Sequence, residues 1–237
     1  MRVVFVHGAC VRDGAWWWSR AAGALAAASG VASVAVRLPS CGETGGTPGT
    51  GGPGLDEDGA EVRRVLRGGE PAVLVGHSYG GIVATVAAAG VPEVTHLVYI
   101  TSFLLAAGEA MAGIGGGGEP PPYLDFAADG TFGARPELMP ELFLHDCDAA
   151  AVDGALARLA RQTAAVNTQP VPADTEPAWQ RLPTTYLVCA EDRATPPDLQ
   201  RAHAARAGRV RELPTGHHPF LSRPDLVAGE LEALVSG

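Results

Sequence analysis

The chain has 237 residues, of which 46% are hydrophobic, enough for one large domain with a buried core. Its formal net charge is −9, and the sequence has no basic stripe for a phosphate backbone, which argues against a nucleic-acid-binding protein. Every basic residue is an arginine, and the absence of lysine excludes a P-loop and Schiff-base chemistry.

Strand-like and helix-like segments alternate at both ends of the chain. Short runs rich in β-branched residues predict strands at 2–6, 31–38, 72–75, 95–100, 184–189 and 209–213. Longer segments between them predict helices at 14–29, 55–66, 80–89, 197–207 and 224–235. This alternation predicts an α/β protein with a mostly parallel sheet and helices on both faces.

The alternation stops between residues 103 and 182. We interpret 1–102 and 183–237 as one core and 103–182 as an inserted lid over one end of the sheet, with a helix at 152–166. The alternative is a mobile surface excursion, but the apolar content favours a lid that lines a pocket. The apolar residues are Phe103, Leu104, Leu105, Met111, Phe126, Phe132, Leu142 and Phe143.

The cysteines and the N-terminal residues indicate a cytoplasmic protein. Cys10, Cys41, Cys147 and Cys189 are far apart, so they predict reduced thiols and neither a zinc site nor a disulfide framework. The first residues run directly into a strand without the regions of a signal peptide. Residues 71–92 carry no charged side chain, but the glycines in the middle predict a buried strand, turn and helix, not a membrane span.

The segment VLVGHSYGG places Ser78 in a G-x-S-x-G pattern. The pattern alone is weak, but here a buried strand precedes it and a small-residue helix follows. A sharp strand-to-helix turn of this kind holds a serine hydroxyl clear of the sheet, and the flanking glycines avoid collisions with neighbouring backbone. Ser78 is therefore the candidate nucleophile.

A serine nucleophile needs a base, and the base needs a carboxylate that orients it. In this arrangement the acid follows a later strand and precedes the histidine. Asp192 follows the 184–189 strand, with Glu191 as the alternative. The other position for an acid, after the 95–100 strand, holds Thr101 and Ser102.

Two adjacent histidines occupy the place expected for the base. His217 and His218 fall in a loop between the last strand and the last helix, and both are candidates. The oxyanion hole needs two backbone N–H groups. We expect one from Tyr79, after the nucleophile, and one from Ala9, where the His7-Gly8 turn bends the chain inward.

Four motifs together resemble the α/β-hydrolase superfamily. They are VHGAC…GAWWW, GHSYGG, YLVCAEDRATPP and TGHHPFLSRP, and they look most like the branch of plant methyl-salicylate and methyl-jasmonate esterases and hydroxynitrile lyases, with bacterial relatives. The resemblance covers 1–102 and 183–237 and is weak across the lid.

This resemblance implies the α/β-hydrolase fold and a role for each site residue. Ser78 would be the nucleophile, Asp192 the acid and His217 the base, since His217 follows the small residue Gly216. Ala9 and Tyr79 would supply the oxyanion N–H groups, and neither a metal nor an organic cofactor is implied. The lyases of this branch carry a lysine after the histidine and a threonine in the oxyanion loop, where this chain has His218 and Gly8.

We therefore expect a serine hydrolase that cleaves carboxylic esters of small to medium, apolar or aromatic molecules through an acyl-enzyme. The alternatives are a natural-product cyclase or lyase that uses the same pocket, and a small-molecule receptor on a hydrolase scaffold. The expected partner is a small-molecule ester, not a nucleic acid or a membrane, and a homodimer stays open. The alanine- and arginine-rich composition resembles proteins of high-GC actinobacteria, where such enzymes often serve secondary metabolism.

Overall fold

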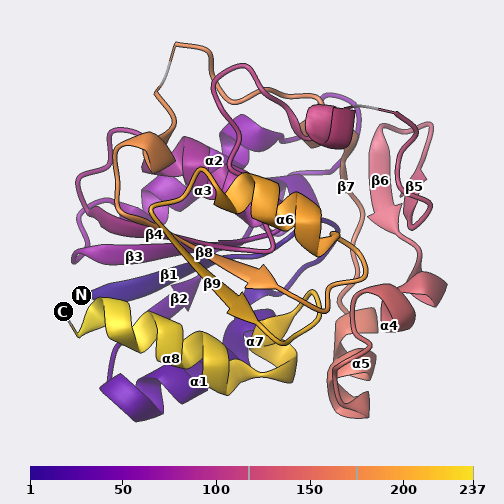
Figure 1. Ribbon diagram of the computed structural model, residues 1–237. Helices are drawn as coiled ribbons and strands as arrows, with labels where there is room; N and C mark the ends of the chain where they lie inside the picture. Colours follow the sequence, from indigo (N-terminus) through magenta and orange to yellow (C-terminus); the bar gives the residue numbers. More distant parts are fainter. Residues whose placement is uncertain (117, 175, 237) are drawn as a thin grey trace.

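A six-stranded parallel sheet lies at the centre of the molecule (Figure 1). The computed structural model describes residues 1–116, 118–174 and 176–236. The strands run in the order β2-β1-β3-β4-β8-β9, and every neighbouring pair is parallel. They are β1 (Arg2–Val6), β2 (Ser33–Ala35), β3 (Ala72–His77), β4 (Val94–Ile100), β8 (Thr184–Cys189) and β9 (Arg209–Leu213).

Helices cover both faces of this sheet (Figure 1). Helices α1 (Gly14–Ser29), α7 (Pro219–Ser222) and α8 (Pro224–Val235) pack on one face, and α2 (Leu55–Leu66), α3 (Tyr79–Ala88) and α6 (Pro197–Ala204) pack on the other. Alternate residues of β1 enter different cores: Val3 and Phe5 join α1 and α8, whereas Val4 and Val6 join α2 and α3. A strand that is buried on both faces has a continuous run of apolar residues in its sequence. The central strands of this sheet could therefore be predicted from the sequence.

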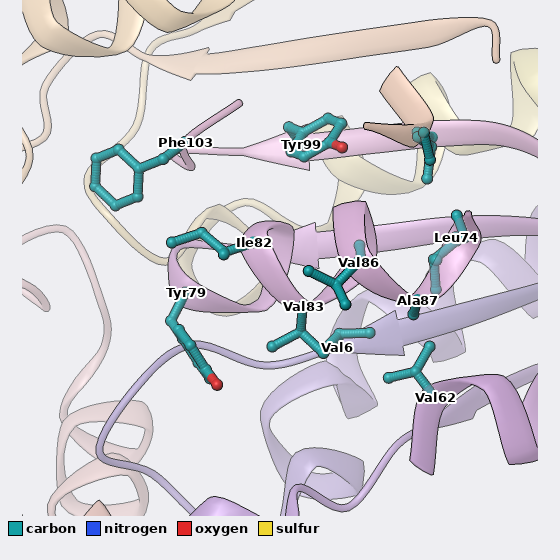
Figure 2. Packing of buried hydrophobic residues seen from close by; sticks show 14 of the residues in the cluster. Val6, Val62, Leu74, Tyr79, Ile82, Val83, Val86, Ala87, Tyr99 and Phe103 are labelled. Atoms are coloured by element: carbon teal, nitrogen blue, oxygen red, sulfur yellow. The ribbon is translucent and has the colours of Figure 1, made fainter. Parts of the chain in front are cut away.

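Helix α3 fixes the segment that carries Ser78. All of its residues are buried. Figure 2 shows Ile82, Val83 and Val86 of α3 packed among side chains from the sheet and α2, including Val6 and Val62. A helix enclosed along its whole length has no freedom to shift, so its first turn is a rigid base for the site.

The lid segment forms a second, antiparallel sheet. Strands β5 (Leu124–Phe126), β6 (Thr131–Ala134) and β7 (Gln162–Thr163) lie beside the main sheet, with α4 (Met139–Leu142) and α5 (Ala149–Leu156) near them (Figure 1). Short 3₁₀ helices span Pro39–Cys41, Met111–Gly116, Pro136–Leu138, Ala164–Asn167 and Ala178–Gln180. The division at 103 and 182 stays a prediction.

The helix expected at 152–166 is wrong. Helix α5 begins one turn earlier, because the Asp148 side chain accepts the N–H of Ala151 at 2.8 Å and caps it, and it ends at Leu156. Gln162 and Thr163 then pair with Phe132 and Thr131 of β6, a long-range contact that overrides the local helical pattern.

Two further elements end three residues earlier than expected, and the other bounds differ by two residues or fewer. The strand expected at 31–38 is only three residues long, because it pairs at the edge of the sheet over Ser33–Ala35. The helix expected at 197–207 ends at Ala204. Among the described residues, no helix has the length and apolar character needed to cross a membrane.

Candidate active site

Ser78 occupies a strained turn between β3 and α3. Its φ of 50° and ψ of −124° are unusual for a residue with a side chain. The Ser78 N–H donates to the carbonyl of Ile100 at 3.1 Å, and the Ser102 hydroxyl donates to the Ser78 carbonyl at 2.5 Å. The end of β4 therefore holds the turn from both sides of the serine.

The glycines around Ser78 allow a close approach of neighbouring backbone. A Cβ on Gly76 would lie 2.5 Å from the Cα of Gly81, and one on Gly80 would collide with the carbonyl oxygen of Val6. Both positions therefore need glycine, as the turn geometry predicted.

His217 and Asp192 meet at the carboxyl end of the sheet. His217 Nδ1 donates to Asp192 Oδ2 at 2.8 Å, and the Asp192 side chain is fully buried. Burial favours the neutral acid, but the charge and hydrogen bond of His217 and the hydrogen bond from Thr101 outweigh it, so the pKa of Asp192 is lowered. Asp192 is thus a carboxylate at neutral pH, facing the imidazole.

Four further donors hold the Asp192 carboxylate. Oδ2 accepts the Thr101 hydroxyl at 2.6 Å and the Gln200 amide at 3.0 Å, and Oδ1 accepts the backbone N–H groups of Ala194 at 2.8 Å and Thr195 at 2.9 Å. Glu191, the alternative acid, is exposed. The geometry therefore pairs Asp192, and not Glu191, with the histidine.

The second histidine, His218, faces away from the carboxylate. Its Nδ1 donates to the carbonyl of Phe143 at 3.0 Å, and burial lowers its pKa to about 3. His77 is also buried, and its Nε2 donates to the carbonyl of His217 at 3.0 Å, while burial holds its pKa well below the usual value. The rings of His77 and His218 are therefore both neutral near pH 7. Of the two adjacent histidines in the loop, His217 is the one paired with an acid.

The three histidine rings lie together, with centroids 4.8 to 4.9 Å apart. Their candidate ligand atoms lie within 4.8 Å of one another. Nitrogen ligands of a tetrahedral zinc ion, at 2.0–2.1 Å bond lengths, lie about 3.3 Å apart. Each ring is also already held by a hydrogen bond to a carbonyl or a carboxylate. The expectation of a metal-free site stays a prediction.

A buried ion pair holds the loop that follows β1. His7 donates from Nδ1 to the carbonyl of Gly8 at 2.8 Å and from Nε2 to Glu43 at 2.7 Å. Burial alone would lower the pKa of His7, but Glu43 outweighs it and raises that pKa. Glu43 also accepts the backbone N–H groups of Leu38 and Asp13, at 2.8 and 2.7 Å, so one carboxylate ties three segments together.

The loop lies directly against the Ser78 turn. A Cβ on Gly8 would be 2.9 Å from His77 Nδ1 and 3.3 Å from Ser78 Cβ. Among the residues that the structure describes, neither the N–H of Ala9 nor that of Tyr79 has a hydrogen-bond partner. Both expected oxyanion donors belong to segments that border Ser78.

Ser78, His217 and Ala9 border one cavity of about 470 Å³ between the core and the lid. Five of the eight apolar residues expected in the lid line it, whereas Leu104, Leu105 and Leu142 do not. The Phe143 ring stands edge-on to His217 with centroids 4.9 Å apart. Glu119 is the one carboxylate and no arginine is present among the described lining residues. Large apolar residues of the lining include Trp17, Phe103, Met111, Tyr123, Phe126, Phe132, Met139 and Phe143.

Three supporting residues escaped the sequence reasoning. Glu43 is the one charged residue in the glycine-rich segment 39–54, and that isolation was an available signal. In the sequence, Thr101 stands out only because it is not an acid, and nothing there indicates that its hydroxyl donates to Asp192. Gln200 lies within α6 and carries no local signal, because its role depends on contacts with the loop after β8.

A comparison with known families identifies the class of protein to which this fold belongs. Residues 3–230 match the family model described as the alpha/beta hydrolase family. The chain therefore belongs to the alpha/beta hydrolase family, as its motifs indicated, and the α/β-hydrolase fold is confirmed.

Individual relatives share less than a third of their residues with this chain. The alpha/beta hydrolase nvfD of Aspergillus novofumigatus is 29% identical over 212 residues, which cover 82% of each chain. A pyrethroid hydrolase from Sphingobium faniae has a TM-score of 0.85 and 22% identity, over 100% of this chain and 98% of that one. The methylesterase MES16 from Arabidopsis has a TM-score of 0.79 and 22% identity, over 100% and 99%. Polyneuridine aldehyde esterase has a TM-score of 0.79 and 19% identity, over the same shares.

Proposed function

We propose that the chain is a serine esterase that cleaves carboxylic esters of small to medium, largely apolar molecules, aromatic ones included. One observation carries the proposal. Ser78 opens onto the same cavity as His217, and His217 is hydrogen-bonded to the buried carboxylate of Asp192. A nucleophile and a base on one cavity, with an acid behind the base that orients it, are the groups that acyl transfer needs.

In the proposed reaction, Ser78 Oγ attacks the ester carbonyl carbon while His217 Nε2 takes the hydroxyl proton. Asp192 keeps the proton on Nδ1 and stabilises the imidazolium that forms. The N–H groups of Ala9 and Tyr79 receive the oxyanion. Collapse of the tetrahedral intermediate releases the alcohol, which takes the proton from His217. Water activated by the same histidine then hydrolyses the acyl-enzyme.

The lining favours neutral, apolar substrates. A cavity of about 470 Å³ with many aromatic side chains suits a molecule of one or two rings or a medium acyl chain. A carboxylate on the substrate would meet no arginine among the described lining residues. The names of the structural relatives, a pyrethroid hydrolase, a methylesterase and polyneuridine aldehyde esterase, support ester substrates for this chain.

The test is hydrolysis of p-nitrophenyl butyrate and methyl benzoate by the wild type and by Ser78→Ala, with Ser19→Ala as the control for an exposed serine. We expect turnover in the wild type and in Ser19→Ala, and a loss of about 1,000-fold or more in Ser78→Ala. A fluorophosphonate should label the wild type and not Ser78→Ala. Binding of esters without turnover in the wild type would instead indicate a receptor.

A further inference from the structure

The loop that carries Ala9 is bound to the lid by its next residue. The N–H of Cys10 donates to the side-chain oxygen Oε1 of Gln162 at 2.9 Å, and the carbonyl of Cys10 accepts the N–H of Ala160 at 2.9 Å. Two residues later, the N–H of Arg12 donates to the carbonyl of Arg158 at 3.0 Å. The loop therefore forms a short antiparallel ladder with the lid segment that leads into β7.

The peptide planes on both sides of Ala9 are fixed. Because a peptide unit is planar and trans, its C=O and N–H point in opposite directions. His7 binds the carbonyl of Gly8, so the N–H of Ala9 points away from His7. Gln162 binds the N–H of Cys10, which fixes the following plane. Cys10 has a φ of 59°, a conformation that a side-chain-bearing residue keeps only where contacts hold it.

Gln162 is itself rigidly held. It has no exposed surface, and its Nε2 donates to the Ser40 hydroxyl at 2.9 Å. That hydroxyl donates to Asp58 Oδ2 at 2.5 Å, and the same carboxylate oxygen accepts the Tyr79 hydroxyl at 2.6 Å. A buried chain of hydrogen bonds thus runs from Cys10, beside one expected oxyanion donor, to the side chain of Tyr79, the other.

Gln162 belongs to the same small sheet as the cavity wall. It is the register partner of Phe132, a buried residue that lines the cavity, whereas Gln162 itself does not line it. The strand that forms the substrate-facing wall and the strand that holds the oxyanion loop are therefore hydrogen-bonded neighbours.

We propose that Gln162 is a positioning residue of the oxyanion hole: through the Cys10 N–H it fixes the direction of the Ala9 N–H, so that the lid contributes to transition-state stabilisation as well as to substrate fit. This inference rests on the proposed esterase function. Gln162 does not touch the reacting atoms, so its loss should weaken binding of the oxyanion and leave ground-state binding of the ester unchanged.

Two variants test the inference in the full-length protein. Gln162→Met keeps the length of the side chain and removes both hydrogen bonds. Gln162→Asn keeps an amide, so it is the gentler change in a buried site, but it is too short to reach the Cys10 N–H. The matched control is Thr163→Val, on the same strand. It removes a buried hydroxyl whose partner is the N–H of Gly49, at 3.3 Å, and not a group of the loop that carries Ala9.

The measurements are kcat and KM for p-nitrophenyl butyrate and inhibition by a trifluoromethyl ketone, which forms a tetrahedral oxyanion with the serine. Loss of a whole oxyanion donor costs about 100- to 1,000-fold in kcat, so a misdirected donor should cost about 10- to 100-fold. We expect this loss in kcat in both Gln162 variants, the same factor in affinity for the ketone, and a KM within about threefold of the wild type.

The outcomes distinguish a role of Gln162 in positioning the Ala9 N–H from a role in the stability of the fold alone. Wild-type kcat in Gln162→Asn, or an equal loss of kcat in Thr163→Val, overturns the inference. If Gln162→Met does not fold, Gln162→Asn alone decides between these results. The proposed function itself fails if the wild type does not hydrolyse esters and Ser78→Ala still reacts with the ketone. That result differs from a Gln162 variant with unchanged kcat, which would overturn only the role of Gln162.

Discussion

The Thr101 hydroxyl and His217 Nδ1 share one oxygen, Oδ2 of Asp192, at 2.6 and 2.8 Å. Thr101 directly follows β4 and has a φ of 41°, a conformation that a β-branched residue rarely adopts. The strain places its hydroxyl beside the carboxylate, where it supports the charged form of Asp192 and limits the directions in which that oxygen can accept the imidazole N–H.

Asp192→Asn should leave the fold intact and reduce kcat/KM by about 1,000- to 10,000-fold. An amide can present an N–H to the histidine, which then carries its proton on the wrong nitrogen for the reaction. Steady-state hydrolysis of p-nitrophenyl butyrate measures the effect. Glu191→Gln is the control, since Glu191 is adjacent but exposed, and it should keep wild-type activity. Similar losses in both variants would contradict the assignment of the acid.

Ser78→Gly should unfold at a higher denaturant concentration than Ser78→Ala, although both should be inactive. The φ of 50° is strained for alanine and open to glycine, and relief of that strain is worth about 1 kcal/mol or more, against a smaller entropic loss for glycine in the unfolded chain. Urea unfolding of the two variants measures the difference. A lower stability for the glycine variant would show that the surrounding contacts, and not the backbone conformation, dominate at this turn.

Much of the fold was predictable because the central strands are buried on both faces. Continuous apolar runs such as Val3–Val6 mark such strands directly, and Ser78 and Asp192 follow two of them, whereas His217 follows the largely exposed edge strand β9. In a parallel sheet those ends meet at one edge, so positions far apart in sequence could be placed at one site. The expected roles of these residues stay predictions until they are tested.

The lid was not predictable in the same way. Strand β7 has two residues and exists only because it pairs with β6, so no local periodicity could reveal it. The role of Gln162 depends on a long-range hydrogen bond to Cys10, and that of Gln200 on side-chain hydrogen bonds to Asp192 and its neighbours in the loop after β8. Buried amides carry no sequence signature, since the same residue type is common on surfaces.

His218→Asn should flatten the dependence of stability on pH. Burial lowers the pKa of His218 from 6.5 to about 3, so between these values the unfolded chain binds a proton at this position and the folded chain does not. Stability therefore falls as the pH drops from about 6.5, by up to about 1.4 kcal/mol per pH unit from this group.

Urea unfolding at pH 7, 6 and 5 measures this contribution as the difference between wild type and His218→Asn. The other titrating groups, among them His7, His77 and Asp58, are common to both proteins and largely cancel. The variant should gain on the wild type as the pH falls. Parallel stability curves would mean that His218 is not held neutral in the folded protein.

Phe126→Ala should alter substrate preference with little loss of stability. Phe126 lines the cavity, is 44% exposed, and stacks on Phe132 at 5.4 Å. Phe132 is fully buried, so Phe132→Ala should cost about 3–5 kcal/mol of stability and is not a clean test. The ratio of kcat/KM for an aryl ester to that for ethyl butyrate should change by about 1–3 kcal/mol in Phe126→Ala. An unchanged ratio would assign Phe126 a structural role alone.

The last prediction is that the wild type releases no significant cyanide from mandelonitrile, while it hydrolyses simple aryl esters. Departing cyanide carries a negative charge and needs a cation near the catalytic histidine. The chain has no lysine, and no arginine is found among the described cavity-lining residues. His7 lines the cavity, but Glu43 pairs with it and neutralises its charge. The neighbour of His217 is His218, whose pKa of about 3 keeps it uncharged. Cyanide assay at pH 5 and 7 checks this, because lowering the pH by two units still leaves His218 neutral in the folded protein. Robust release that disappears in Ser78→Ala would overturn the esterase assignment, and release that rises steeply toward pH 5 would identify a protonated His218 as the missing cation.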